Sequence, residues 1–273
     1  MAGQPLTPPG WQLRRLAVCG SSEDELDGWL RALGPAAQAT LQRTSLAVVA
    51  ERQLQGRGQR GRSWHSPPGG LWLSAALAWP SGAAPLTLAA AVGLALQLEG
   101  LGLAPQIKWP NDLMLDGHKL AGLLARLRLA GGRVRWAQVG LGLNGTNAVP
   151  AGAIALGACL PPERADPAAL LPLALAALDW AQGHAQDPET VLDLANGRLL
   201  RPPQGVLHAG QRWDVVGLGR QGSLVVRRGS QQLELQQLEP QPLEPQPLEP
   251  QPPSGQASGP PSGAPGLSPE NRA

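Results

Sequence analysis

A strand–turn–strand pattern at residues 107–124 constrains the fold of this chain more than any other feature. The residues before the turn are apolar apart from Lys108, and Pro110 fixes φ and removes a backbone donor. Asn111 and Asp112 are turn-forming residues whose side chains bond back to the main chain. Taken alone, the segment also fits an ordinary hairpin with solvated charges.

The same pattern continues into a second turn and a returning strand. Asp116 and Gly117 are typical of a tight hairpin turn, and residues 120–129 predict the strand that follows it. The segment therefore favours neighbouring antiparallel strands that hold charged side chains close to a rigid turn.

A basic loop, residues 51–64, precedes this segment. Three glycines alternate with four arginines, and after Glu51 no acidic residue occurs until Glu99. Glycines let backbone N–H groups approach an anion, and arginine offers a planar fork of donors for phosphate or carboxylate. Because the like charges repel, we expect the loop to be mobile when empty and ordered by an anionic ligand. An RG-rich nucleic-acid contact and a plain solvated loop are the alternatives for this motif alone.

Together, and in this order, the two motifs resemble the biotin–protein ligase family, in the form without an N-terminal DNA-binding domain. The family's biotin loop looks like Gln53–Trp64, and its Lys-Trp-Pro-Asn-Asp segment matches Lys108–Asp112 without a change. Its next segment is similar to Lys119–Leu124, and its Gly-x-Gly-x-Asn element looks like Gly140–Asn144. The resemblance covers roughly residues 12–236.

Two departures from the family pattern fall within these motifs. Where the family usually has Ser-Thr-Asn, this chain has Ser21, Ser22 and Glu23. Gln59 stands where several members have an arginine, which predicts a weaker hold on the activated intermediate. The Ser22 hydroxyl has two interpretations: it caps a helix, or it contacts the ureido ring of biotin as the resemblance implies.

Helical and strand patterns are mixed without strict alternation, which predicts an α+β fold with a mixed sheet packed against helices. The resemblance implies the class II synthetase-like catalytic domain of biotin and lipoate ligases. We expect helices from Ser22 to about Leu33, from Pro85 to before Gly102, and after Asp166-Pro167 and Asp187-Pro188, with further strands near 46–50, 71–78, 134–143 and 153–159.

Short β-rich runs separated by glycines occupy residues 206–235 and predict a small barrel, for which the resemblance implies an SH3-like domain. A Leu-Glu-Pro-Gln-Pro repeat and a Pro/Gly/Ser-rich stretch follow, and they predict a disordered tail. The expected organisation is an N-terminal extension (1–11), a catalytic domain (12–200), the small C-terminal domain (201–236) and the tail (237–273).

Composition narrows the range of function classes. A formal charge of +2 over 273 residues does not indicate general attraction to nucleic acid or membranes. Two distant cysteines and the lack of a signal-peptide pattern favour the cytoplasm, and the most apolar run, 86–98, is too short to span a bilayer. Only about ten residues precede the first motif-bearing segment, so we expect no DNA-binding domain. We also expect a monomer or a weak homodimer.

The resemblance implies an ATP-dependent ligase that uses Mg²⁺, activates biotin as biotinyl-AMP and transfers it to a lysine of the biotin carboxyl carrier protein of acetyl-CoA carboxylase. Arg57 and Lys119 would carry the catalysis. Biotin would be bound by Ser21, Ser22, Gln53, Gly56, Arg57, Gly58, Gln59, Lys119 and Gly122. ATP would be bound by Arg60, Arg62, Trp64, Lys108, Asn111, Asp112 and Asn144, with Asp112 as the candidate Mg²⁺ ligand.

Three alternatives remain. A lipoate or octanoate ligase or transferase shares the fold, although the Lys-Trp-Pro-Asn-Asp segment and the spacing of the basic loop argue against it. A non-catalytic binder of biotin or nucleotide is compatible with Glu23 and Gln59. An RNA-binding module is disfavoured, because the basic residues gather in one loop without stacking aromatics on a neighbouring sheet.

Overall fold

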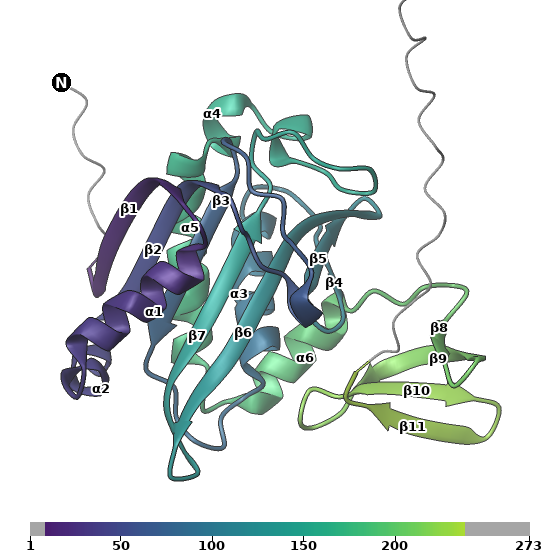
Figure 1. Ribbon diagram of the computed structural model, residues 1–273. Coiled ribbons are helices and arrows are strands. Elements are labelled where there is room, and N and C mark those ends of the chain that lie inside the picture. Colours follow the sequence, from purple (N-terminus) through teal and green to yellow (C-terminus); the bar gives the residue numbers. More distant parts are fainter. Residues whose placement is uncertain (1–8, 238–273) are drawn as a thin grey trace, which may run out of the picture. The chain divides into compact units, whose positions relative to one another are not determined.

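A seven-stranded mixed sheet forms the centre of the computed structural model, which describes residues 9–237 (Figure 1). Its strands lie in the order β1-β2-β3-β7-β6-β5-β4. Only β1 and β2 run parallel, and every other neighbouring pair in this sheet is antiparallel. In chain order the strands are β1 (Trp11–Cys19), β2 (Ser45–Gln53), β3 (Leu71–Leu77), β4 (Gln106–Lys108), β5 (Asp112–Leu115), β6 (His118–Ala130) and β7 (Arg133–Leu143).

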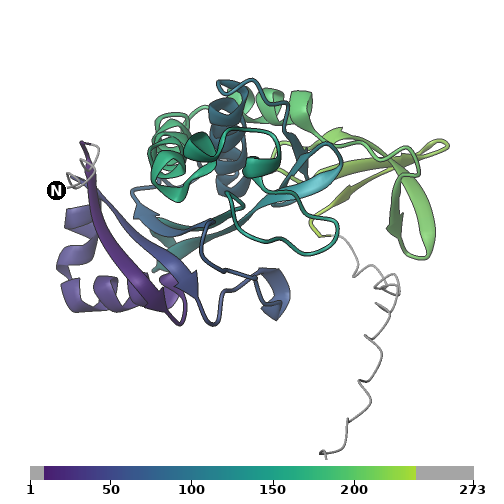
Figure 2. The same ribbon diagram turned by 90° about the horizontal axis from the view of Figure 1, so that it is seen from above.

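Helices cover both faces of this sheet, as the two ribbon views show (Figures 1 and 2). On one face, α1 (Ser22–Leu33) and α2 (Ala36–Leu41) bury apolar side chains against β2 and β3. On the other face, α3 (Leu86–Glu99) is apolar all round because it lies between the sheet and α5 (Pro167–Gly183). The remaining helices are α4 (Pro162–Ala165) and α6 (Pro188–Arg198). This arrangement confirms the mixed sheet packed with helices that the sequence predicts.

Most elements begin where local sequence signals place them. Asp166 and Asp187 cap α5 and α6 by accepting hydrogen bonds from Ala168 N and Thr190 N, and a proline follows each cap. Asp116 and Gly117 both have positive φ (50° and 78°), as the predicted tight turn between β5 and β6 requires.

Two local predictions are wrong. Residues 153–159 form no strand; they contain a 3₁₀ helix at Leu156–Ala158, and Ala153 forms an isolated bridge to Lys119. Ser21, not Ser22, caps α1, and its hydroxyl accepts from Glu23 N at 3.3 Å. The helix begins one residue earlier than the capping-box pattern suggests, and the Ser22 side chain lies against Ser74 of the sheet.

A four-stranded antiparallel sheet in the order β11-β10-β9-β8 follows α6. Leu218 N donates to Asn196 of α6, and the Trp109 indole donates to Gly222 O at 2.8 Å, so this sheet is tied to the segment before β5. A small β domain is therefore confirmed, whereas its SH3-like character stays a prediction. Its strands are β8 (Val206–His208), β9 (Gln211–Leu218), β10 (Leu224–Arg228) and β11 (Gln231–Leu235).

The expected tail from residue 237 lies almost wholly outside the described residues. Within residues 9–237, none of the helices is both long and apolar enough to cross a lipid bilayer.

Candidate active site

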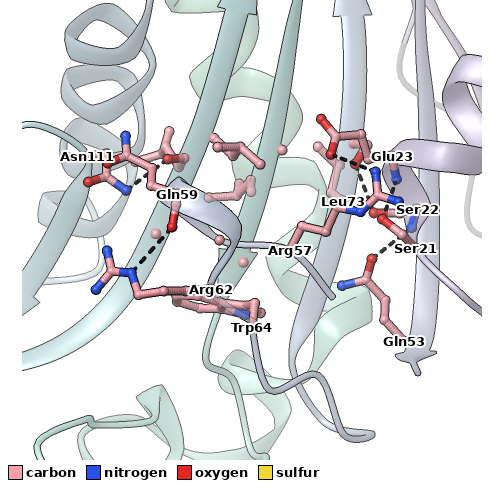
Figure 3. A pocket seen from close by; sticks show the side chains of 18 of the residues that line it. Ser21, Ser22, Glu23, Gln53, Arg57, Gln59, Arg62, Trp64, Leu73 and Asn111 are labelled. Atoms are coloured by element: carbon pink, nitrogen blue, oxygen red, sulfur yellow. Dashed lines mark hydrogen bonds and ion pairs between the residues drawn. The ribbon is translucent and has the colours of Figure 1, made fainter. Parts of the chain in front are cut away.

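One cavity gathers residues from both motif segments. It contains about 720 Å³ of empty space, part of it open to solvent, and its walls come from the start of α1, the end of β2, the basic loop, β3, β6 and β7 (Figure 3). Eleven of the predicted site residues line it: Ser21, Ser22, Gln53, Arg57, Gly58, Gln59, Arg62, Trp64, Asn111, Lys119 and Gly122. The sheet therefore brings together residues that lie as much as 101 positions apart.

A network of neutral hydrogen bonds surrounds Gln53 at the wall of the cavity. Ser22 N donates to Gln53 Oε1 at 2.7 Å, and Gln53 Nε2 donates to Ser66 Oγ at 2.9 Å. Ser66 Oγ in turn donates to Trp64 O at 3.1 Å, and the hydroxyls of Ser22 and Ser74 are 2.8 Å apart. The orientation of the Gln53 amide is thus determined from both sides. We call these four side chains, Gln53, Ser22, Ser66 and Ser74, the neutral end.

The Trp64 indole forms a wall of the cavity and lies directly on two glycines. Gly122 of β6 and Gly142 of β7 are paired across neighbouring strands. A Cβ on Gly142 would lie 2.4 Å from Trp64 Nε1, and one on Gly122 would lie 2.8 Å from the same ring. Any larger residue would displace the indole, which is the physical reason for glycine at both positions. The Trp64 indole N–H is buried without a hydrogen-bond partner in the structure.

Lys119 places a cation in the cavity next to the Trp64 wall. Its Nζ lies 2.8 Å from Asp112 Oδ1 and 4.8 Å from the centre of the Trp64 ring. The lysine is therefore held by a carboxylate and by the face of an aromatic ring, with about 30% of its side chain exposed. An anion that enters the cavity would find this charge already oriented.

Arg57 is surrounded by acids from α1. Its guanidinium lies 2.7 Å from Asp24 Oδ2 and 3.8 Å from Glu23 Oε2. Glu23 also forms a close ion pair with Arg126 of β6. Burial, and secondly the charge of Arg128, lowers the pKa of Arg126. Two carboxylates of α1 therefore act as counter-ions to Arg57 of the basic loop.

The basic loop has backbone order of its own. Gly58 N donates to Arg62 O at 2.7 Å, Trp64 N donates to Gly56 O at 2.8 Å, and Gln59–Gly61 forms a 3₁₀ turn. Arg62 also donates from Nε to Gln59 O. These bonds turn the Arg57, Gln59 and Arg62 side chains toward the cavity.

Five predicted site residues do not line the cavity. Gly56 packs behind it against Trp64 O, and Asp112 lies beside it, next to Lys119 and Gly122. Asn144 is buried and donates to Ile154 O at 3.1 Å, which is a structural role in this structure. Lys108 and Arg60 are exposed, Lys108 on β4 and Arg60 on the 3₁₀ turn.

Reasoning from the sequence missed several residues of the cavity. Ser74 is the polar residue that interrupts an apolar strand, and it is buried in contact with Ser22. The polar residue within an apolar strand was the sequence signal that could have identified Ser74. Glu23 was visible only as a departure from a motif, and nothing in the sequence connected its partner Arg126 with the site. The other cavity residues not predicted are Ser63, Leu73, Leu123, Leu124, Gly140, Leu141 and Gly142.

No group of three or more His, Cys, Asp or Glu side chains that would suit a metal ion occurs within residues 9–237. Asp112 is the carboxylate beside the cavity on the Lys119 side. A hard cation such as Mg²⁺ often uses one carboxylate together with substrate phosphates, so the donor set fits a metal that arrives with a nucleotide and does not fit a dedicated protein cage.

Residues 36–144, which include most of the cavity, match the model of the "Biotin/lipoate A/B protein ligase family". Over these residues the chain is similar to that family. It is 38% identical over 154 residues to a biotin–[acetyl-CoA-carboxylase] ligase of Paracoccus denitrificans, which covers 54% of this chain and 58% of that relative. It is 41% identical over 102 residues to the bifunctional ligase/repressor BirA of Bacillus subtilis, or 36% of this chain and 31% of BirA. The chain thus spans less than two thirds of the length of these relatives.

Solved biotin protein ligases share the fold. The enzyme from Aquifex aeolicus, determined in complex with biotin and ATP, superposes with a TM-score of 0.65 at 22% identity and covers 82% of this chain and 94% of its own. The enzyme from Leishmania major, in complex with biotinyl-5-AMP, gives a TM-score of 0.52 at 21% identity, with 84% and 99% covered. The likeness extends over both sheets of the described part.

Proposed function

We propose that this chain is an ATP-dependent biotin–protein ligase. The observation that carries the proposal is one cavity whose lining combines two chemically different groups of side chains. Gln53 and the Ser22 hydroxyl suit a polar, uncharged ring such as the ureido group of biotin, while Arg57, Arg62 and Lys119 suit a carboxylate and phosphates. A substrate with a neutral head and a carboxylate tail would find partners for both parts in this cavity.

The proposed chemistry has two steps. The biotin carboxylate attacks the α-phosphorus of ATP, which forms biotinyl-AMP and releases pyrophosphate. A lysine amine of the acceptor then attacks the acyl carbon, forms an amide and displaces AMP. Both reactants of the first step are anions, so the protein contributes mainly alignment and charge neutralisation. No nucleophile from this chain is needed.

We assign roles to the residues on this basis. Arg57 holds the carboxylate and then the acyl phosphate, and Lys119 stabilises the charge that develops on the same oxygens. The orientation of Lys119 by Asp112 and Trp64 supports this role. Arg62 and Asn111 belong to the nucleotide side of the cavity, and the ring of Trp64 separates the two ligands. Ser21, Gly58, Gln59 and Gly122 complete the biotin side.

We also assign roles to the predicted site residues that do not line the cavity. We propose Arg60 and Lys108 as outer phosphate contacts, Asn144 as support for Lys119 O, and Gly56 as support for Gln53. Asp112 would hold Mg²⁺ together with the phosphates, and the metal would supply charge neutralisation when bound. We propose residues 12–200 as the catalytic domain and 201–236 as an SH3-like domain.

The acceptor that we propose is the biotin carboxyl carrier protein of acetyl-CoA carboxylase, in the cytoplasm. Relatives named biotin–[acetyl-CoA-carboxylase] ligase from Paracoccus denitrificans and Mycobacterium tuberculosis support this choice. Both cysteines are unpaired, which agrees with a reducing compartment.

The deciding experiment is ATP-dependent transfer of biotin to a purified carrier domain, with lipoate and octanoate as competing substrates. Labelling with biotin alone would support the proposal. Labelling with lipoate or octanoate instead would favour the other branch of the family. Tight biotin binding without transfer would indicate a binder, and loss of both would contradict the proposal.

A further inference from the structure

Glu23 introduces a negative charge into the wall of a cavity that we propose to receive an anion. Its side chain lines the cavity and only 6% of the residue is exposed. A buried carboxylate without a counter-charge is costly, and it would also repel the carboxylate of a substrate. The charge of Glu23 must therefore be balanced within the protein.

Arg126 provides that balance. It reaches Glu23 from β6 and forms an ion pair with it. It also lines a shallow hollow beside the cavity, together with Glu23, Arg57 and Arg62. Arg128, the next arginine on this face of β6, does not neutralise Glu23, because it is bound at 2.9 Å to both carboxylate oxygens of Asp27.

The pairing of Glu23 with Arg126 changes the contacts of Arg57. Arg57 lies 3.8 Å from Glu23 but 2.7 Å from Asp24, and its side chain and that of Asp24 are each 49% exposed. An exposed ion pair of this kind is weak and screened by solvent. A substrate carboxylate can therefore displace Asp24 from Arg57 at little cost, provided that the buried Glu23 does not take Arg57 first.

We infer that Arg126 is a positioning residue: it neutralises Glu23 and so keeps the Arg57 guanidinium available to the carboxylate of the substrate. This inference rests on the proposed function. An ion pair with a purely structural role would weaken the site when either partner is lost. The positioning role demands opposite effects, because loss of Arg126 frees Glu23 to engage Arg57, whereas loss of Glu23 frees two cations for the ligand.

The test measures the binding of biotin and of neutral biotin amide by calorimetry, using the full chain. The variants are Glu23→Gln, Arg126→Gln and the double variant. Glu25→Gln is the matched control, because Glu25 is an exposed acid of the same helical turn. We expect Arg126→Gln to weaken biotin about tenfold, Glu23→Gln to keep or tighten it, and the double variant to lie within about twofold of the wild type. Biotin amide should bind all of them alike.

Weakening of biotin by both single variants would overturn the inference, as would equal losses for biotin amide. If Arg126→Gln does not fold, the sign of the Glu23→Gln effect decides, and Arg126→Lys, which retains the charge, should bind biotin nearly as well as the wild type. A wild-type chain that binds neither ligand would overturn the proposed function and the inference with it. If the wild-type chain binds biotin but Arg126→Gln and Glu23→Gln change its affinity in the same direction, the inference is overturned and the proposed function is not.

Discussion

Two groups of side chains at the cavity are held in different ways: the neutral end, and the cations Arg57 and Lys119, which we call the charged end. At the neutral end, Gln53 is held by short hydrogen bonds to Ser22 N and Ser66 Oγ. At the charged end, Arg57 and Lys119 are held by carboxylates, those of Asp24 and Asp112. A neutral hydrogen bond does not depend on the charge of a ligand, whereas the partners of a partly exposed ion pair can be exchanged for a ligand's own oxygens. The comparison indicates that the neutral end recognises the substrate and the charged end responds to the charge of the substrate.

The largest expected effect comes from the charged end. Lys119→Ala removes the cation that we place at the developing charge, and we expect adenylate formation to fall by about 100-fold or more. Pyrophosphate release measures this step, and a thermal unfolding curve should show that the fold is intact. Arg43→Ala, which removes an exposed cation outside the cavity lining, is the control. Near-normal adenylation by Lys119→Ala would contradict the assigned role.

Arg57→Ala should weaken biotin binding and retention of the adenylate about tenfold, because a charged hydrogen-bond donor to the carboxylate is lost. Calorimetry over a range of salt concentrations sharpens the comparison. The affinity of the wild type should fall with salt, and that of Arg57→Ala should respond less, since a screened charge has been removed. Equal salt dependence in both proteins would show that the cation at this end does not govern binding.

The neutral end should respond differently. Ser66→Ala leaves Gln53 Nε2 without its acceptor and lets the amide turn, which we expect to cost about 1 kcal/mol of biotin binding energy. The loss should be the same at low and high salt. A strongly salt-dependent loss would break the distinction between the two ends. Thr44→Ala removes a hydroxyl outside the cavity and serves as the matched control.

The smallest effect is expected at Gln59, where we predict that Gln59→Arg slows the release of the adenylate about twofold to threefold, as a partly exposed cation would. A chase with unlabelled biotin measures the rate. Unaltered release would mean that glutamine in place of arginine at this position does not affect how tightly the adenylate is held.

Local signals in the sequence predicted much of the fold. Three features depend on residues that are neighbours along the chain, so the sequence pattern predicts them. They are the Asp-Pro pairs before α5 and α6, the Asp116-Gly117 turn and the apolar run of α3. The pattern missed β1, α2 and α4 and misjudged residues 153–159, whose conformation depends on long-range contacts such as the bridge to Lys119.

The sequence by itself determined the chemical inventory of the site: the arginines of the basic loop, Lys119, Gln53 and the small residues that line the cavity. Only the tertiary structure decided which charges meet. Packing of α1 against β2 and β3 brings Glu23 to Arg57 and, across the sheet, to Arg126. Residues 103 positions apart share no local signal, because an ion pair depends on distance in space and not on separation along the chain.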